Sequence, residues 1–152
     1  TNVAVVSAGA KSILDIGLSL EKLETFGVPV LGYQTDELPA FYTQQSGYQV
    51  DYKMDNPTQI ADVINAKWDL GLDGGILVTN PVPKEDQIAK DTIDNVIQEA
   101  VTEAEHKGIS GKELTPFLLD KIKDITEGES LVTNIALVKN NAHLGAKVAC
   151  NL

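Results

Sequence analysis

The chain has 152 residues, of which 43% are hydrophobic and 22% charged, a composition typical of one globular domain with a core of its own. Its 22 acidic and 12 basic residues give a formal net charge of −10, which argues against nucleic acid and against an anionic membrane surface as partners. The single cysteine, Cys150, excludes an internal disulfide and fits a reducing, cytoplasmic setting, and no apolar run is long enough to cross a bilayer.

The first third of the chain predicts two buried strands with a helix between them. Residues 3–7 form a short, mostly β-branched run that ends in small residues, and residues 28–33 form a second run of this kind. Between them, Ser19 is a candidate N-cap for a helix over 20–26, which Gly27 would end.

Residues 34–47 have no clear period, and we expect a long structured loop there that lies over a site. A weak edge strand is expected over 48–53. The rest of the chain predicts one more strand and four helices. In chain order they are a helix over 57–70 that Asn56 caps, a strand over 74–79, and helices over 85–107, 115–127 and 130–149.

The last helix is apolar on more than one side, so we expect it to be well buried. Strands that alternate with helices predict an α/β fold with a mixed or largely parallel sheet flanked by helices. No internal repeat, low-complexity segment or linker divides residues 1–152, which therefore form one domain or part of one.

The segment SAGAKS at 7–12 is the most informative for chemistry, because it places Lys11 directly after the first strand. Ligands of open α/β sheets collect beyond the carboxyl ends of the strands, and small residues let a ligand approach the backbone closely. Ser12 and Asp15 are spaced like a capping pair, which predicts a helical turn just past Lys11. The dipole of that helical turn, together with partial burial, would disfavour the ammonium form of Lys11. A neutral amine is what imine formation with a sugar aldehyde requires.

Other interpretations of this segment remain open. A lysine that caps a turn or faces solvent would fit the same pattern. A phosphate-binding loop fits poorly, because Val5 and Ala10 stand where its two glycines belong.

Polar side chains elsewhere offer fewer candidates. Asn134 and Asn141 lie seven residues apart on one face of the last helix, where they would either bind a ligand or cap neighbouring backbone. His106 and His143 have no Ser or Cys partner visible in the sequence, and we interpret both as structural. The acidic residues of the helix over 85–107 are best explained as a solvated face, and we assign no metal ligand to this chain.

Four segments that cover nearly the whole chain are distinctive when taken together. They are SAGAKSILDIGLSLEKLETFGVPVLGYQTDELPAFY at 7–42, GGILVTNPVPKED at 74–86, GKELTPFLLDKI at 111–122 and ESLVTNIALVKNNAHLGA at 129–146. In this order and spacing they resemble the pseudouridine-5′-phosphate glycosidase family, also called indigoidine synthase A-like proteins. The resemblance implies that residues 1–152 are the C-terminal half of such a protein, a fragment of a larger α/β/α domain.

The resemblance also implies an activity. The family reversibly cleaves the C–C glycosidic bond of pseudouridine 5′-phosphate to uracil and ribose 5-phosphate, with the opened ribose held as an imine on a lysine. Lys11 matches the lysine of the family's AGAKS motif, and Asn134 matches an asparagine associated with its active site.

The same resemblance shows what this sequence lacks. The family's general-acid glutamate, the aspartate that holds Mn²⁺ through water and most phosphate-binding residues belong to the N-terminal half. Family members are homotrimers. We therefore expect the isolated segment to be inactive, and we expect apolar surface normally covered by the missing half to promote association.

Two other functions also fit part of the sequence. The first is a non-catalytic sugar-phosphate or nucleotide-binding fragment, which the missing acid and metal residues favour for the segment alone. The second is a class I aldolase-like enzyme, which shares the lysine chemistry but does not explain the segments GKELTPFLL and NIALVKNN.

Overall fold

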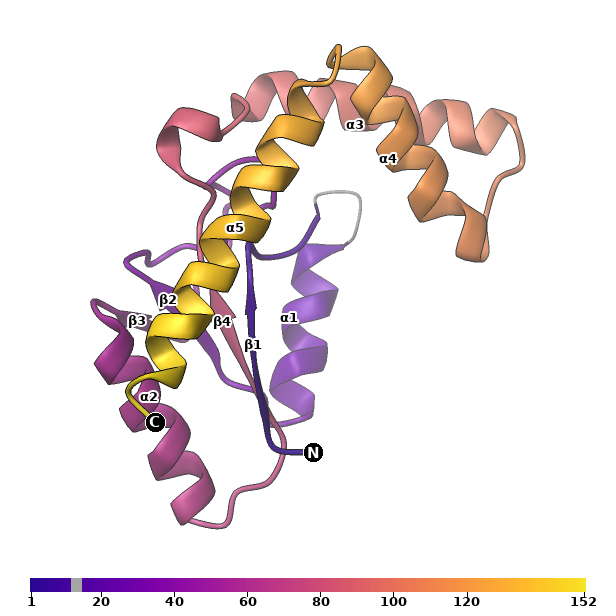
Figure 1. The fold of residues 1–152 in the computed structure, drawn as a ribbon. Coiled ribbons are helices and arrows are strands. Elements are labelled where there is room, and N and C mark those ends of the chain that lie inside the picture. The colour runs from indigo at the N-terminus through magenta and orange to yellow at the C-terminus, as the bar shows by residue number, and fades with distance from the viewer. Residues whose placement is uncertain (12–14) are drawn as a thin grey trace.

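The computed structural model describes residues 1–11 and 15–152, which form a parallel sheet with helices on both faces (Figure 1). The strands are β1 (Val3–Ser7), β2 (Val30–Tyr33), β3 (Tyr52–Met54) and β4 (Gly75–Thr79). The α-helices are α1 (Ile16–Thr25), α2 (Pro57–Asp69), α3 (Lys90–His106), α4 (Leu114–Ile125) and α5 (Glu129–Ala149), and two short 3₁₀ turns are η1 (Lys84–Asp86) and η2 (Gly111–Glu113).

The described strands form one four-stranded sheet in the order β1-β4-β2-β3, and every neighbouring pair is parallel. This confirms the α/β class. All four carboxyl ends therefore meet at one edge, and the segments that follow β1, β2 and β4 lie side by side there. The strand expected over 48–53 is shorter and starts later, at Tyr52, but it does occupy the edge of the sheet.

The two faces of the sheet have separate cores. On one face α2 and α5 pack over β2 and β4, where Ile60, Ile64 and Leu144 meet Leu31 and Val78. The core on the other face joins α1 to the 34–47 loop, and its buried residues are Ile16, Val30, Leu38 and Ala40. The hydrophobic faces of the helices thus fix the sheet from both sides.

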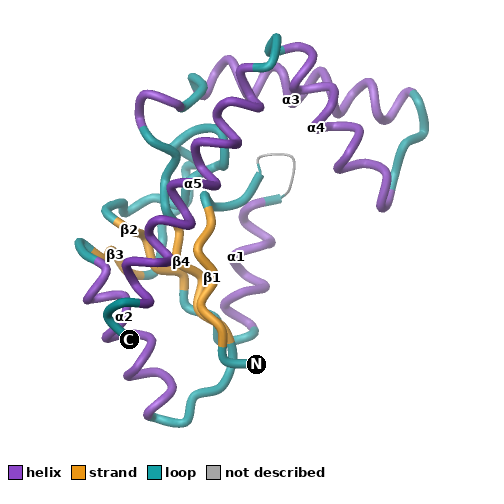
Figure 2. The backbone as a smooth tube through the Cα atoms, in the orientation of Figure 1, coloured by secondary structure: helices purple, strands orange, loops and turns teal. Residues whose placement is uncertain are grey.

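A third core lies beyond the carboxyl edge of the sheet, where α3 and α4 form an arm (Figure 2). Its buried residues are Tyr42, Ile88, Ile93, Ile97, Ala100, Ala104, Leu118 and Ile122. None of the helices in the described parts of the chain is long and apolar enough to span a bilayer.

The start of α1 differs from the prediction. The N-cap is Asp15, whose carboxylate accepts a hydrogen bond of 2.9 Å from the N–H of Leu18. Ser19 lies inside the helix, and its hydroxyl donates to the carbonyl of Asp15 at 2.7 Å. The carboxylate of Asp15 satisfies a first-turn N–H, so the helix begins a full turn earlier than Ser19 would have allowed. The helical turn expected from Ser12 falls on residues 12–14, outside the described residues.

The helix expected over 85–107 is interrupted. Residues 87–89 are extended between η1 and α3, and buried Ile88 donates its N–H to the carbonyl of Tyr42 at 2.9 Å. This contact with a loop more than forty residues away outweighs the local helical pattern. The predicted cap at Asn56 is confirmed, because its side chain accepts from the N–H of Gln59 at 3.0 Å.

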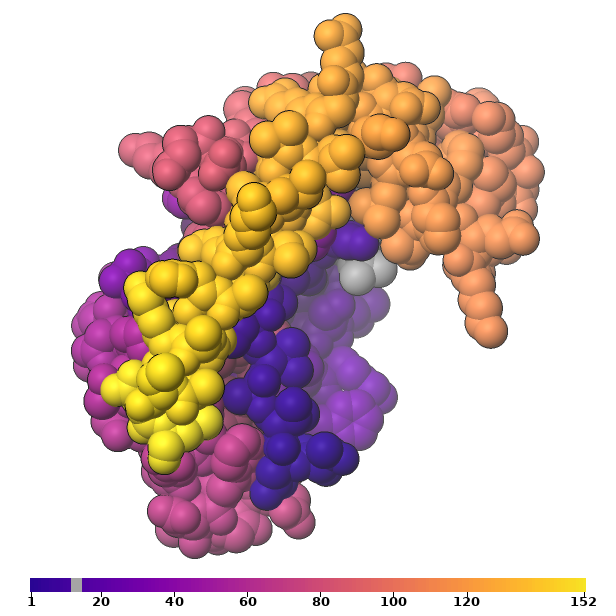
Figure 3. Space-filling view, in the orientation of Figure 1, coloured from indigo at the N-terminus to yellow at the C-terminus, as the bar shows by residue number. Residues whose placement is uncertain are grey.

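Helix α5 is less buried than predicted, because only one of its apolar faces packs on the sheet. On that face Leu144 and Val148 join the core over the sheet, while Leu137 packs against Ala8 and Val82 just beyond the strands and Thr133 donates to the carbonyl of Asp86. Its other apolar residues are about half exposed or more, and in Figure 3 the helix forms a ridge across the molecule with β1 uncovered beside it. The apolar surface of α5 consists of Leu131 (46%), Val132 (62%), Ile135 (48%) and Val138 (58%). Strand β1, at the edge of the sheet, separately exposes Val3 (44%) and Val5 (48%).

Replacing Val132 and Val138 together by lysine should reduce self-association of this chain without lowering its melting temperature. Both side chains are largely exposed, so charge there costs little folding energy but disfavours burial against another surface. Sedimentation velocity would measure the effect. Leu70→Lys is the control, because Leu70 is 75% exposed at the end of α2, away from the apolar surface. Equal association of wild type and double variant would show that the apolar surface plays no part.

Glu103 ties α3 to α4. Its carboxylate oxygens lie 2.7 Å from Nζ of Lys107 and 2.7 Å from Nζ of Lys121. Hydrogen bonds from these two lysines lower the pKa of Glu103 from 4.5 to about 2. A carboxyl whose pKa is lower in the folded state stabilises the fold at neutral pH and loses this contribution as the pH falls from 4.5 towards 2.

Glu103→Gln should therefore lower the melting temperature slightly at pH 7 and have a much smaller effect near pH 2, where the carboxyl is already partly protonated. The effect is small because the ion pairs are solvent-accessible. Thermal unfolding at the two pH values would measure it, with Glu105→Gln, an exposed neighbour on α3, as the control. A loss that persists unchanged at pH 2 would contradict the assignment to charge.

Candidate functional site

The turn that carries Lys11 is clamped against the 34–47 loop. Gly9 forms an isolated antiparallel bridge with Ala40, and the N–H of Phe41 donates to the carbonyl of Ala8 at 3.1 Å. Gly9 has a φ of 82°, and a Cβ placed on it would lie 1.7 Å from the carbonyl oxygen of Pro39. Only glycine fits this close approach of two backbones.

Lys11 leaves this clamp half-buried, with its Nζ 5.3 Å from the centroid of the Phe41 ring. No ion pair or hydrogen bond joins Nζ to another of the described residues, so the ring is its defined neighbour. Phe41 has a φ of 69°, in the left-handed region that costs a bulky residue about 1–3 kcal/mol. Such strain persists only where the surroundings enforce it, and here the bond to Ala8 does so.

The Phe41 ring is itself held on several sides. Tyr42 meets it edge to face at a centroid distance of 4.9 Å, and Ala8, Val82 and Leu137 pack around it. Burial raises the pKa of Tyr42, so its phenol stays neutral and adds no charge beside the lysine. The Nζ of Lys11 thus faces an ordered aromatic surface.

Strand β4 contributes the next polar group at the edge of the sheet. Asn80 donates its backbone N–H to the carbonyl of Ser7 at 2.7 Å and its side-chain amide to Oδ1 of Asn141 at 3.2 Å. Asn140 donates to the carbonyl of Pro81 at 3.0 Å. These bonds fasten α5 to the ends of β1 and β4, so Asn141 has a structural partner. Sequence reasoning missed Asn80, although its place directly after a buried strand follows the rule that singled out Lys11.

Asn134, the other predicted site residue, is half-buried on α5. Residues three or four apart share a helix face, so Asn134 lies on the same side as Leu137 and Asn141, towards the end of β1. Its amide makes no hydrogen bond within the described parts of the chain and is available to a ligand. Phe41, whose ring faces Lys11, packs in one cluster with Leu137, which lies one helical turn from Asn134. The structure gives no direct contact between Asn134 and Lys11.

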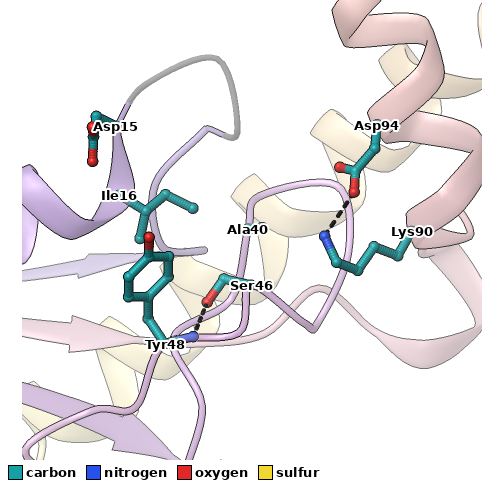
Figure 4. A pocket seen from close by; sticks show the side chains of 7 residues that line it. All are labelled: Asp15, Ile16, Ala40, Ser46, Tyr48, Lys90 and Asp94. Carbon is teal, nitrogen blue, oxygen red and sulfur yellow. Dashed lines mark hydrogen bonds and ion pairs between the residues drawn. The ribbon is translucent and has the colours of Figure 1, made fainter.

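A cavity of about 320 Å³ adjoins the Lys11 clamp and is shown in Figure 4. It is bounded by the start of α1, the 34–47 loop and the start of α3, and its lining residues are Asp15, Ile16, Ala40, Ser46, Tyr48, Lys90 and Asp94. Lys90 lies 2.7 Å from Asp94, so its charge is already neutralised. The cavity is of a size for a small hydroxyl-bearing molecule, and its lining offers the hydroxyls of Ser46 and Tyr48 and the carboxylate of Asp15 as hydrogen-bonding groups.

A second cavity of about 290 Å³ lies at the carboxyl ends of β2 and β4. Its lining is polar but uncharged and consists of Tyr33, Gln34, Thr35, Gln44, Asn80, Pro81, Val82, Pro83 and Asn140. Several of these amides donate to backbone carbonyls, as Gln44 does to Val82 at 2.9 Å. The cavity therefore suits neutral hydrogen-bonding groups.

Metal binding is not supported by the side chains that the structure describes. Among residues 1–11 and 15–152, no three His, Cys, Asp or Glu side chains gather as a metal site would require. These residues do not form a donor set for Mn²⁺.

The fold and the position of Lys11 define a parallel α/β protein whose candidate site lies at the carboxyl edge of the sheet, centred on a lysine amine. Residues 1–151 match the model of the family described as indigoidine synthase A like protein, and the chain belongs to this family.

Known relatives agree with this assignment. The chain is 60% identical over 152 residues to the pseudouridine-5′-phosphate glycosidase of Caldanaerobacter subterraneus subsp. tengcongensis and 61% identical to that of Clostridium botulinum. Each alignment covers 100% of this chain and 50% of the relative, so the chain spans about half the length of the curated relatives that it matches.

Solved structures show the same fold. An indigoidine synthase A-like protein from Thermotoga maritima superposes with a TM-score of 0.86 at 34% identity, over 98% of this chain and 49% of the other. The prealnumycin C-glycosynthase AlnA, in complex with ribulose 5-phosphate, gives a TM-score of 0.84 at 33% identity, over 97% and 49%.

Proposed function

We propose that this chain carries the imine-forming lysine of a pseudouridine-5′-phosphate glycosidase, and that Lys11 is this lysine. The observation that carries the proposal is the place of the Lys11 amine, half-buried at the carboxyl end of β1, in a chain 60% identical to a glycosidase of that name. The sugar phosphate bound to the related AlnA supports a pentose phosphate as the ligand.

The chemistry is simplest in the direction of synthesis. The neutral amine of Lys11 adds to the aldehyde carbon of open-chain ribose 5-phosphate, and loss of water leaves a protonated imine with its positive charge on Nζ. C5 of uracil attacks the imine carbon, the C=N electron pair returns to nitrogen, and C5 then loses its proton to a base.

Ring closure completes the reaction. The sugar's 4-hydroxyl attacks the same carbon, loses its proton and displaces the amine, which leaves with a proton. The net change is uracil plus ribose 5-phosphate to pseudouridine 5′-phosphate plus water, and cleavage is the reverse. Asn134, whose amide makes no hydrogen bond to any residue that the structure describes, is proposed to bind a sugar hydroxyl.

The remaining parts of the machinery are proposed to come from the half that relatives have and this chain does not span. We infer that residues 1–152 act as the C-terminal half, that the other half supplies the general acid and the residues that hold Mn²⁺, and that the complete protein is a homotrimer in the cytoplasm. The exposed, unpaired Cys150 fits a reducing compartment.

Borohydride trapping tests the role of Lys11. The full-length protein is incubated with ribose 5-phosphate, reduced with borohydride and mapped by mass spectrometry. Reduction turns the imine into a stable secondary amine, and we expect this adduct on the peptide that contains Lys11. An adduct confined to another lysine, such as Lys90 beside the cavity, would overturn the assignment.

The alternative is a non-catalytic sugar-phosphate-binding protein, which the missing acid and metal residues favour for this chain alone. Affinity for ribose 5-phosphate by calorimetry, without an adduct in the trapping experiment, would support it.

Asn134→Ala should raise the KM for the sugar phosphate by about three- to tenfold, the effect of losing one hydrogen bond, and should leave the melting temperature unchanged. Steady-state kinetics and thermal unfolding would measure the two effects. Asn141→Ala is the matched control two helical turns away on the same face, and it should lower stability by about 1 kcal/mol because it breaks the bond to Asn80. Equal KM values for the Asn134 variant and wild type would contradict the proposed contact.

A further inference from the structure

The aromatic ring beneath Lys11 is a part of the site that the proposed function does not yet use. Phe41 presents its ring to Nζ at 5.3 Å from the centroid, within the range of a cation–π interaction. The 34–47 loop that carries it reaches Lys11 from thirty residues further along the chain.

The ring is held where it is by the backbone rather than by chance packing. Phe41 adopts a left-handed φ of 69°, its N–H is bonded to the carbonyl of Ala8, and the preceding Ala40 is bridged to Gly9. Gly9 and Phe41, both with a left-handed φ, thus lie on either side of one clamp that fixes the ring relative to the lysine.

We propose that Phe41 is a positioning residue for Lys11, and that its ring face stabilises the positive charge on Nζ when the lysine is a protonated imine. The inference rests on the proposed function of Lys11 and adds to it the group that holds the charged intermediate. The negative face of an aromatic ring attracts a cation without bonding to it covalently.

The choice of a ring rather than a carboxylate has a chemical reason. A carboxylate that pairs closely with the protonated imine would neutralise its charge and weaken the electron demand that draws in C5 of uracil. An aromatic face stabilises the cation more weakly and leaves the imine carbon electrophilic. Within the described parts of the chain no acidic side chain pairs with Lys11, and the Phe41 ring is the group that faces its Nζ.

The chain contains a matched control. Nζ of Lys107 lies over the ring of Phe117 at the same distance of 5.3 Å, on the α3–α4 arm. Changes to the Phe117 ring therefore weaken an equivalent interaction without touching the Lys11 clamp.

The test introduces mono-, di- and trifluorinated phenylalanine at position 41 of the full-length protein, and in a second series at position 117. Fluorine withdraws electron density from the ring face while nearly keeping its shape, so a purely structural role would not respond. Along the Phe41 series we expect the rate of the trapped Lys11 adduct and kcat to fall stepwise, by about three- to tenfold in total. The KM for ribose 5-phosphate and the melting temperature should stay constant, and the Phe117 series should be flat.

Two conventional variants accompany the series. Phe41→Leu should match the trifluorinated protein, and Phe41→Tyr, which keeps an electron-rich ring, should retain the wild-type rate. A wild-type protein that forms no adduct on Lys11 would overturn the proposed function and this inference with it. Normal adduct formation in wild type with a flat Phe41 series would overturn only the role of the ring.

Discussion

Replacing Lys11 by arginine should abolish the borohydride-trapped adduct and lower kcat for uracil release from pseudouridine 5′-phosphate by about 10³-fold or more. A guanidinium stays protonated at every accessible pH, so it has no free electron pair with which to attack the sugar carbon. It keeps the charge over the Phe41 ring, and we therefore expect the fold and the binding of the sugar phosphate to survive.

The rate of uracil release in the full-length protein, followed with intact-protein mass, measures this effect. Lys22→Arg is the matched control, because Lys22 also lies over an aromatic ring, that of Phe26 at 4.6 Å, in the last turn of α1. It should behave as wild type. Unimpaired cleavage in the Lys11→Arg protein would exclude covalent catalysis by this residue, whatever its position in the fold.

Replacing Gly9 by alanine should destabilise the protein by at least about 2 kcal/mol and should also slow adduct formation on Lys11. Two causes combine at this position. The left-handed φ of 82° disfavours any side chain, and a Cβ would lie 1.7 Å from the carbonyl oxygen of Pro39, which forces two backbones apart. Phe41 lies two residues after Pro39 on the 34–47 loop. A shift of Pro39 away from Gly9 would therefore also move the Phe41 ring away from Lys11.

Gly27→Ala separates the effect of the left-handed φ from the effect of the clash with Pro39. Gly27 also has a positive φ, 63°, but nothing lies within 4 Å of its Cβ position. It should cost only about 1 kcal/mol and leave adduct formation unchanged. Urea unfolding measures the stabilities, and trapping with ribose 5-phosphate measures the chemistry. Identical losses of stability and of adduct formation at the two glycines would show that the clamp of Ala8 and Gly9 on the 34–47 loop has no particular importance.

The exposed apolar residues of α5 and of β1 relate the site to the length of the chain. β1 is at the edge of the described sheet and exposes Val3 and Val5, while α5 exposes Leu131, Val132, Ile135 and Val138. The relatives are about twice as long as this chain. A surface of this kind is consistent with the proposal that the remaining half packs here and completes a site of which Lys11, Phe41 and Asn134 form one side.

The sequence by itself determined the features that depend on neighbouring residues. The strand over 3–7, the cap at Asn56 and the place of Lys11 directly after a strand follow from signals a few residues long, and the structure confirms all three. The α/β class follows in the same way from the alternation of strands and helices. The chemical roles of Lys11 and Asn134 rest on the resemblance to a family and stay predictions.

Only the tertiary structure decided how distant segments compete for the same residues. Ile88 is buried against Tyr42 and breaks a helix that its local pattern favours, and α5 leaves an apolar side exposed because the sheet offers it only one face. The ring of Phe41 reaches Lys11 through a left-handed backbone that no local propensity would predict. The physical reason is that caps and periodicity act within one or two turns, whereas burial and backbone strain are settled by contacts between residues thirty or more apart.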